Sequence, residues 1–356
     1  MRSTYDAIAA ALVLLVVAAC GGEAPAARPA HTTTIRAAAK PAQRWLKGQL
    51  HLHSARSADS ATPPADVVRW YRRHGYDFIV FTDHNHVTVE RGDERMLVIP
   101  GVELTRNLET CVPTPDPGDA CLLHVNALFV SPSHAGPVDL PAAGTRRADV
   151  YAASIAQARA MDGVAQINHP NFQHGADADV LFELSRRGAA WVEIANEAID
   201  SDNAGDGTHP STEALWDAVL TRGGRLFGTA TDDAHHYDDA STVRARGETA
   251  YVGNRGWVHV EAARDARAIR AALEAGRFYA SNGVELTRVA VVDGALEIAI
   301  AQNAPPHVLR FIGPSGRVVS EVRGHRARQP LVERGYVRAV VLSPEGRRAW
   351  TQPVFR

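Results

Sequence analysis

Residues 76–84 read Tyr-Asp-Phe-Ile-Val-Phe-Thr-Asp-His. The middle of this stretch is apolar, which is typical of a strand in a parallel sheet that is covered on both faces. We expect the strand to span residues 76–81. Asp83 and His84 follow it at once, and both are residue types that bind metal ions. An apolar strand that ends in such residues is the unit from which the rest of the chain can be interpreted.

The same unit recurs along the chain. Residues two apart in a strand point to the same side, so the paired residues of a His-x-His or Asp-x-His segment can reach one ion. Any one of these segments alone would be an ordinary loop or turn, but their repetition predicts a multinuclear metal centre. The strands expected beside candidate ligands are residues 46–52 with His51 and His53, 96–99 with Glu103, 122–130 with His124, 164–167 with His169, and 225–229 with Asp233 and His235.

Helical segments alternate with these strands over most of the chain. We expect helices over residues 64–74, 149–161, 179–187 and 212–221. Such alternation implies right-handed crossovers and a parallel sheet or barrel, in which a site forms at the carboxyl ends of the strands. From about residue 284 helical patterns vanish, and short alternating segments separated by turns predict a small antiparallel β-domain over residues 284–356.

Composition sets broad limits. A chain of 356 residues fits two domains, or one large domain with an appendage, and 45% hydrophobic residues is enough to fill a core. The net charge of −2 and the lack of a basic stretch give no nucleic-acid signal. A small-molecule substrate is the partner that the metal-binding pattern favours.

The first 44 residues are predicted to lie outside the fold. Residues 7–19 are apolar but too short to span a bilayer, and they match a secretory signal. The segment Val17-Ala18-Ala19-Cys20-Gly21 resembles a bacterial lipobox, so we expect residues 1–20 to be a lipoprotein signal peptide with lipid on Cys20. An ordinary signal peptide cut nearby, or an uncleaved anchor, is the alternative. Residues 21–44 have the composition of a flexible tether. The protein is therefore expected to be exported and anchored by lipid to a membrane of a bacterial cell envelope, facing the periplasm or the exterior.

Two further cysteines, Cys111 and Cys121, bracket a turn-rich loop. Exported proteins fold where disulfides form, and an even pair around a short loop favours a bond between them. Two free thiols, or two soft metal ligands, are the alternatives.

Four motifs are similar to those of a known family. They are Gly48-Gln-Leu-His-Leu-His-Ser, Asp232-Asp-Ala-His-His-Tyr, Gly276-Arg-Phe-Tyr-Ala-Ser and Ala349-Trp-Thr-Gln-Pro. Together with the other metal-ligand segments they resemble the PHP (polymerase and histidinol phosphatase) superfamily of metal-dependent phosphoesterases, in its carbaryl-hydrolase-like branch. The resemblance covers residues 45–283 and implies a distorted (β/α)7 barrel with a two- or three-metal site at its rim. It also implies the small C-terminal antiparallel β-domain.

The resemblance assigns the candidate ligands to three ions. His51, His53 and Asp233 would hold the first, and Glu103 would bridge it to a second held by His124 and His169. The third would be held by Asp59, His84 and His235. The common family pattern has Ser-Asp-Gly after the His-x-His, whereas Asp59 lies one residue further on here, in Ser57-Ala58-Asp59-Ser60. Histidine and carboxylate ligands suit Zn²⁺, Mn²⁺ or Fe.

Six other residues near these motifs are candidates for supporting roles. Asp83, His86, Asp232 and His236 could orient the ligand imidazoles, although a place on a polar loop is the alternative for the two histidines. Arg56 and Arg106 could pair with an anionic substrate, although a surface arginine is the ordinary alternative.

The predicted function is that of a metal-dependent hydrolase. The first hypothesis is a phosphoesterase that cleaves phosphomonoesters or phosphodiesters with a metal-bound hydroxide. The alternative is a carbamate, ester or amide hydrolase, as the closer branch implies. Cationic groups on the third-metal side would favour phosphate, and an apolar pocket would favour the alternative. A lipid-anchored binding module with a vestigial site is a hypothesis of another class.

Overall fold

The computed structural model describes residues 45–356. The signal peptide, the tether and the lipidated Cys20 lie outside the described residues, and they stay predictions. Within residues 45–356 no helix is both long and apolar enough to cross a membrane.

The helices lie close to where the sequence predicts them. Pro64 starts the first helix in the position that suits proline, and Gly188, with a φ of 107°, ends the third. Two shorter helices, the fifth and the sixth, were not expected. The six α-helices of the described chain are α1 (Pro64–Arg73), α2 (Arg147–Ala160), α3 (Ala178–Arg187), α4 (Thr212–Thr221), α5 (Ala240–Ala245) and α6 (Ala266–Glu274).

The strands form two large sheets and two small ones. A five-stranded sheet has the order β10-β9-β8-β6-β5, and a ten-stranded sheet has the order β16-β15-β18-β19-β12-β11-β1-β2-β4, with β20 paired to β18. The strands that build the candidate site are β1 (Trp45–Gln49), β2 (Phe78–Val80), β4 (Leu97–Ile99), β5 (Gly101–Leu108), β6 (Cys121–Leu128), β8 (Val164–Ile167), β9 (Ala189–Asn196) and β10 (Phe227–Thr231). The others are β3 (His86–Val87), β7 (Gly136–Pro137), β11 (Trp257–Glu261), β12 (Phe278–Ser281), β13 (Leu286–Val292), β14 (Ala295–Ile300), β15 (His307–Ile312), β16 (Val318–Gly324), β17 (Arg326–Pro330), β18 (Tyr336–Leu342), β19 (Arg348–Thr351) and β20 (Val354–Phe355).

The predicted (β/α)7 barrel is wrong. Both large sheets are mixed, and the strands of residues 45–356 close into no barrel. In the five-stranded sheet β10, β9 and β8 are parallel, but β6 is antiparallel to both β8 and β5. The cause is the connection between β5 and β6, which is a loop without a helix, so the two strands pair as antiparallel neighbours rather than by a crossover.

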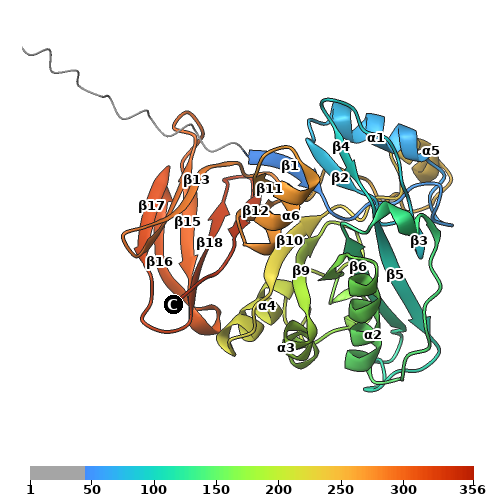
Figure 1. The fold of residues 1–356 in the computed structure, drawn as a ribbon. Helices are drawn as coiled ribbons and strands as arrows, with labels where there is room; N and C mark the ends of the chain where they lie inside the picture. The colour runs from blue at the N-terminus through green and yellow to red at the C-terminus, as the bar shows by residue number, and fades with distance from the viewer. Residues whose placement is uncertain (1–44) are drawn as a thin grey trace, which may run out of the picture. The chain divides into compact units, whose positions relative to one another are not determined.

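The strands after residue 284 are antiparallel, as predicted, but only β13, β14 and β17 form a sheet of their own. β12 pairs with β19, so β15, β16, β18 and β19 continue the sheet that contains β1 and β2. Figure 1 shows these strands, in orange and red, running on from the β11–β12 region. A buried ion pair at 2.6 Å, between Arg338 of β18 and Asp217 of α4, also joins this region to the five-stranded sheet's helices. The domain boundary itself stays a prediction.

The largest core cluster lies between the five-stranded sheet and the helices α2, α3 and α4. Ile155, Leu184 and Trp216 contribute from the three helices, and all are buried. Burying large apolar side chains contributes about 2–3 kcal/mol each. This layer supports one face of the strands that carry the candidate site.

Candidate metal centre

The candidate ligands come from strand ends and from within two strands. His51 and His53 follow β1, His169 follows β8, and Asp233 and His235 follow β10. The chain after β1 is fixed to the chain after β10 by backbone bonds, from Asp233 N to His51 O at 3.0 Å and from His53 N to Ala234 O at 2.9 Å. These bonds place segments far apart in the sequence side by side.

Glu103 lies inside β5 rather than after the strand predicted at residues 96–99, and His124 lies inside β6, within the strand predicted over residues 122–130. The antiparallel register pairs His124 with Thr105, two residues from Glu103. Residues two apart in a strand share a face, so Glu103 and His124 face the same side. Their Oε1 and Nδ1 atoms are 3.1 Å apart.

All nine predicted ligands come together in three adjoining groups that could hold metal ions. Within each group the ligand atoms lie within 4.8 Å of one another. The groups are His51, His53 and Asp233; Glu103, His124 and His169; and His53, Asp59, His84 and His235. They match the three predicted sets, except that His53 also lies within reach of the third.

Glu103 and Asp233 lie at the centre of the first two groups. Nε2 of His51 is 3.2 Å from Asp233 Oδ1 and 3.6 Å from Glu103 Oε1. Nε2 of His169 is 3.5 Å from Glu103 Oε1 and 3.9 Å from Asp233 Oδ2. Glu103 therefore contacts histidines of both groups, as a bridging carboxylate would.

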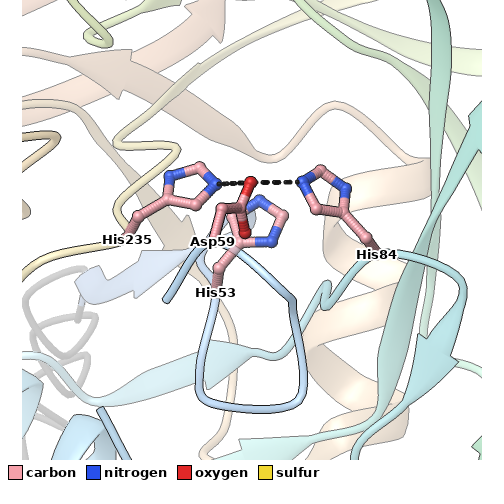
Figure 2. Close-up of side chains that lie close together, drawn as sticks. All are labelled: His53, Asp59, His84 and His235. Carbon is pink, nitrogen blue, oxygen red and sulfur yellow. Dashed lines mark hydrogen bonds and ion pairs between the residues drawn. The ribbon is translucent and has the colours of Figure 1, made fainter. Parts of the chain in front are cut away.

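The third group forms around Asp59. Its Oδ2 atom is 3.1 Å from Nε2 of His84 and 3.3 Å from Nε2 of His235. Figure 2 shows this carboxylate between the two imidazoles, with His53 beside it. The one-residue-longer loop after His53 therefore still brings Asp59 to the group, although about half of its side chain is exposed.

The pKa values in the cluster show that its carboxylates are negatively charged and favour positive charge beside them. Burial acts to raise the pKa of Asp59, but His235 and His84 outweigh it and hold that pKa well below its usual range. Burial acts to lower the pKa of His84, but Glu103 and Asp59 outweigh it and raise that pKa to about 10. Burial lowers the pKa of His53 to about 4, with help from His235 and His84, so His53 is neutral near pH 7 and can offer a lone pair. The carboxylates are thus balanced either by protons on histidine or by cations.

Buried ligand atoms show that the residues fit a metal. Nε2 of His51 is shielded from solvent and makes no hydrogen bond, and Oε2 of Glu103 has only histidine nitrogens around it, of which Nδ1 of His84 is 2.7 Å away. A buried polar atom without a partner costs about 1–3 kcal/mol. Ions held by these atoms would satisfy them, and a set of imidazoles and carboxylates is suited to Zn²⁺, Mn²⁺ or Fe.

Two of the candidate ligands have strained backbones. His169 has a φ of 21° and Asp233 a φ of 51°. Non-glycine residues with positive φ are uncommon and gather at functional sites, where the surrounding structure holds them in place. The strain therefore supports a functional role for the ends of β8 and β10.

Glu193 is a site residue that sequence reasoning missed. It lies inside β9, is fully buried, and places Oε1 2.7 Å from Nδ1 of His51. Its Oε2 accepts a bond from the backbone N–H of His169 at 2.7 Å and from Asn196 Nδ2 at 2.9 Å. The detectable signal was a single charged residue in the apolar strand Ala190-Trp-Val-Glu-Ile-Ala195.

Three asparagines also surround the ligands. Asn168 donates to Glu103 Oε1 at 2.9 Å, and Asn196 donates to Asp233 Oδ2 at 3.1 Å. Oδ1 of Asn107 is 2.9 Å from Nε2 of His124. These contacts orient carboxylates and an imidazole, a task on which metal affinity depends strongly.

The four predicted orienting residues have different places. Asp83 accepts a bond from Ser57 Oγ at 3.0 Å, and Ser57 Oγ is 3.0 Å from Nδ1 of His53, so Asp83 reaches a ligand through one hydroxyl. Asp232 instead accepts from the backbone N–H groups of residues 254–256. His236 lines the pocket beside the ligands. His86 lies in β3, which pairs with β7, and is not among the pocket-lining residues.

Neither predicted arginine lines the pocket. Arg106 is buried, and its Nε donates to Ser154 of α2 at 3.0 Å, on the helix side of the sheet. Arg56 is exposed in the loop after β1. Neither arginine is therefore placed to pair with an anionic substrate in this pocket.

A pocket of about 600 Å³ opens beside the ligands. Phe172, Leu122 and Tyr251 give part of its wall apolar or aromatic character, and Asp200 and Glu248 add carboxylates. Among the residues of the described chain that line it, none is Lys or Arg. A small molecule of ordinary size can enter such a pocket and reach the ligand cluster.

The predicted disulfide between Cys111 and Cys121 is confirmed. It closes the loop that joins β5 to β6, the two strands that carry Glu103 and His124. A disulfide is typical of proteins that fold in an oxidising compartment, which is consistent with export.

Comparison with protein-family models and with curated protein sequences gives no match.

Proposed function

We propose that this protein is a metal-dependent hydrolase. The observation that carries the proposal is the convergence of six histidines and three carboxylates in three adjoining groups at one pocket. The resemblance to the PHP superfamily supports the same function from the motifs. Divalent ions in such a site activate a water molecule as nucleophile and neutralise charge on the reacting group.

The residues of the chain would share this work. Glu103 lies between the first two groups and would hold two ions in fixed relation to each other. His124 and His169 complete the second group. Glu193 and the three asparagines would keep the ligands in the orientation that binding requires. The apolar wall of the pocket would hold the part of the substrate that does not react and would keep bulk water from it.

Phosphoester hydrolysis is the first candidate reaction. Three divalent ions would carry six positive charges against the carboxylates of Asp59, Glu103 and Asp233. The net charge of the loaded metal centre would be positive, so the ions themselves would attract an anionic phosphate without a cationic side chain. Asp200 and Glu248 further out reduce that attraction, and this favours a singly charged phosphodiester over a doubly charged phosphomonoester.

Hydrolysis of a carbamate, ester or amide is the second candidate. The specific observation in its favour is the lack of Lys and Arg among the residues that line the pocket, together with the aromatic rings of Phe172 and Tyr251. A neutral substrate needs no cationic side chain and gains from an apolar wall.

One assay tests the proposed hydrolase activity and distinguishes the two candidate reactions. The chain is reconstituted with Mn²⁺ or Zn²⁺ and tested on p-nitrophenyl phosphate, bis(p-nitrophenyl) phosphate and 1-naphthyl methylcarbamate. Metal-dependent turnover of the diester above the monoester supports the first candidate, and turnover of the carbamate alone supports the second. Glu103→Gln should abolish the activity, while Glu109→Gln, on the exposed end of the loop after β5, should not. No turnover of any of the three by the reconstituted chain would contradict a hydrolase of these classes.

A further inference from the structure

A second group of histidines and carboxylates lies outside the site described above, where three loops meet. The loops are residues 109–120, closed by the disulfide; residues 168–177, which contain the 3-10 turn Phe172–His174; and residues 197–211, before α4. Ligand-type atoms of Asp116, His174 and His209 lie within 4.8 Å of one another, and Asp202 and Asp206 form a neighbouring group with His174.

Each of the two imidazoles has a carboxylate on one ring nitrogen. Nδ1 of His174 is 2.6 Å from Asp119 Oδ2, and Nδ1 of His209 is 3.2 Å from Asp206 Oδ2. A carboxylate on one nitrogen fixes the tautomer of a metal-binding histidine and leaves the other nitrogen as the ligand.

The opposite nitrogens meet two further carboxylates. Nε2 of His209 is 2.9 Å from Asp116 Oδ2. Nε2 of His174 is shielded from solvent, has no hydrogen-bond partner, and is 3.7 Å from Asp202 Oδ2. A buried nitrogen without a partner is rare and requires an explanation, which a bound cation would supply.

The charges of the group also favour a cation. Four carboxylates, those of Asp116, Asp119, Asp202 and Asp206, surround the two imidazole rings. One divalent ion at this group would balance part of the negative charge of these carboxylates.

We propose that this group is a structural zinc site. Asp116, His174 and His209, whose ligand atoms lie within 4.8 Å of one another, are three of its ligands. Asp202, 3.7 Å from Nε2 of His174, is the fourth, and Asp119 and Asp206 orient the two histidines. Two imidazoles and two carboxylates make up the four-ligand set of a closed site, which leaves no position for a substrate.

The ion would connect the three loops to one another. Phe172 of the second loop and Asp200 and Ser201 of the third line the pocket of the metal centre. Asn171 already joins these two loops, because its Nδ2 donates to the carbonyls of Asp202 and Pro210 at 2.9 and 3.0 Å. Zinc at this site would add the disulfide-closed loop to that connection and would fix one wall of the pocket. The proposal does not depend on the proposed hydrolase function.

The test is a zinc count on the full chain. The protein is stripped with chelator, titrated with Zn²⁺ and analysed for bound metal by elemental analysis. His209→Ala should bind one zinc ion fewer per chain than the unmodified protein. His134→Ala, which replaces an exposed histidine of another loop, should bind the same number. The comparison is repeated with Glu103→Gln in both proteins. Adding His209→Ala to Glu103→Gln should again remove one zinc ion, and that loss identifies this site apart from the main centre.

A second readout is thermal unfolding. Zinc should raise the unfolding temperature of the unmodified chain and of Glu103→Gln, and it should raise that of the His209→Ala double variant less. If His209→Ala does not fold, Asp116→Asn replaces it, because that side chain is more than half exposed; the affinity of one zinc site should then fall about ten-fold or more. An unchanged zinc count and affinity in His209→Ala or Asp116→Asn would overturn the proposal and leave an ion-pair cluster.

Discussion

Oε1 of Glu193 lies 2.7 Å from Nδ1 of His51, and neither side chain is exposed to solvent. Burial acts to lower the pKa of His51, but Asp233 and Glu193 outweigh it and hold that pKa well above its usual value. The contact fixes the ring so that Nε2, the atom without a hydrogen-bond partner, faces Asp233 and Glu103. Glu193 therefore has the position of a residue that orients a metal ligand.

Replacing Glu193 tests this role. Glu193→Gln keeps the size of the side chain but removes its charge, so we expect metal affinity at the first group to fall about 10- to 100-fold. The measurement is competition for the metal with a chelator of known affinity. Glu197→Gln is the matched control, because Glu197 is joined to Asn282 rather than to a ligand. Equal affinity in Glu193→Gln and the control would contradict the role.

Asp59 decides whether the third group binds an ion. Asp59→Ala should lose one metal ion per chain and most activity, while the other two groups stay loaded, because it removes the carboxylate between His84 and His235. Elemental analysis gives the count. Asp66→Ala, in the exposed first turn of α1, is the control. Unchanged metal content with a stability loss of only about 1 kcal/mol would mean that Asp59 serves only to hold the turn of the loop before α1.

The disulfide should stabilise the fold measurably. Cys111→Ser with Cys121→Ser opens a loop whose ends are ten residues apart in the chain. The entropy of closing such a loop predicts a loss of about 3 kcal/mol in the free energy of unfolding. Urea denaturation of the oxidised protein and the double variant measures it. A loss below about 0.5 kcal/mol would show that the loop is held by its other contacts.

His259 predicts a pH dependence of stability that is separate from the metal centre. Burial, together with Lys47, lowers the pKa of His259 to about 3, and the side chain accepts a bond from Trp257 Nε1 at 2.9 Å. The unfolded chain takes up a proton here near pH 6.5, whereas the folded protein does not until about pH 3. Acid therefore favours the unfolded chain, and the contribution is lost as the pH falls below about 6.5.

The measurement is urea unfolding with chelator present, at about pH 7.5 and about pH 5.5. The free energy of unfolding should fall between these two pH values by about 1 kcal/mol less in His259→Gln than in the unmodified protein. His134→Gln, at an exposed position, should keep the full loss. The same loss in both variants would show that His259 is not the group responsible.

The sequence could predict the members of the site better than the fold that carries them. Eight of the nine ligands could be found because each is a histidine or carboxylate beside or within an apolar strand, whereas Asp59 was implied by the family resemblance; all nine converge. The roles of Glu193 and the asparagines could not be assigned from the sequence, although Glu193 stands out as a charged residue in an apolar strand, because these roles depend on which strands are neighbours in the folded chain. Local periodicity shows where β8 and β9 are, but not which strands they pair with.

The barrel could not be excluded for the same reason. The strands β5 and β6 look like others in the sequence, and their antiparallel pairing depends on a loop that carries no helix. Glu103 and His124 reach the site from within these strands rather than from their ends. An alternation of strands and helices elsewhere in the chain therefore predicted crossovers that this hairpin does not have.

The metal content of the purified chain tests the central claim most directly. Protein prepared without chelator, or reconstituted with Zn²⁺ or Mn²⁺, is compared with Glu103→Gln by elemental analysis and circular dichroism. We expect about two or three divalent ions per chain in the clustered groups. We also expect Glu103→Gln to lose at least one of them while keeping its fold, because an amide cannot bridge two cations as a carboxylate does. Fewer than about one ion per reconstituted chain, or an unchanged count in Glu103→Gln, would contradict the central claim.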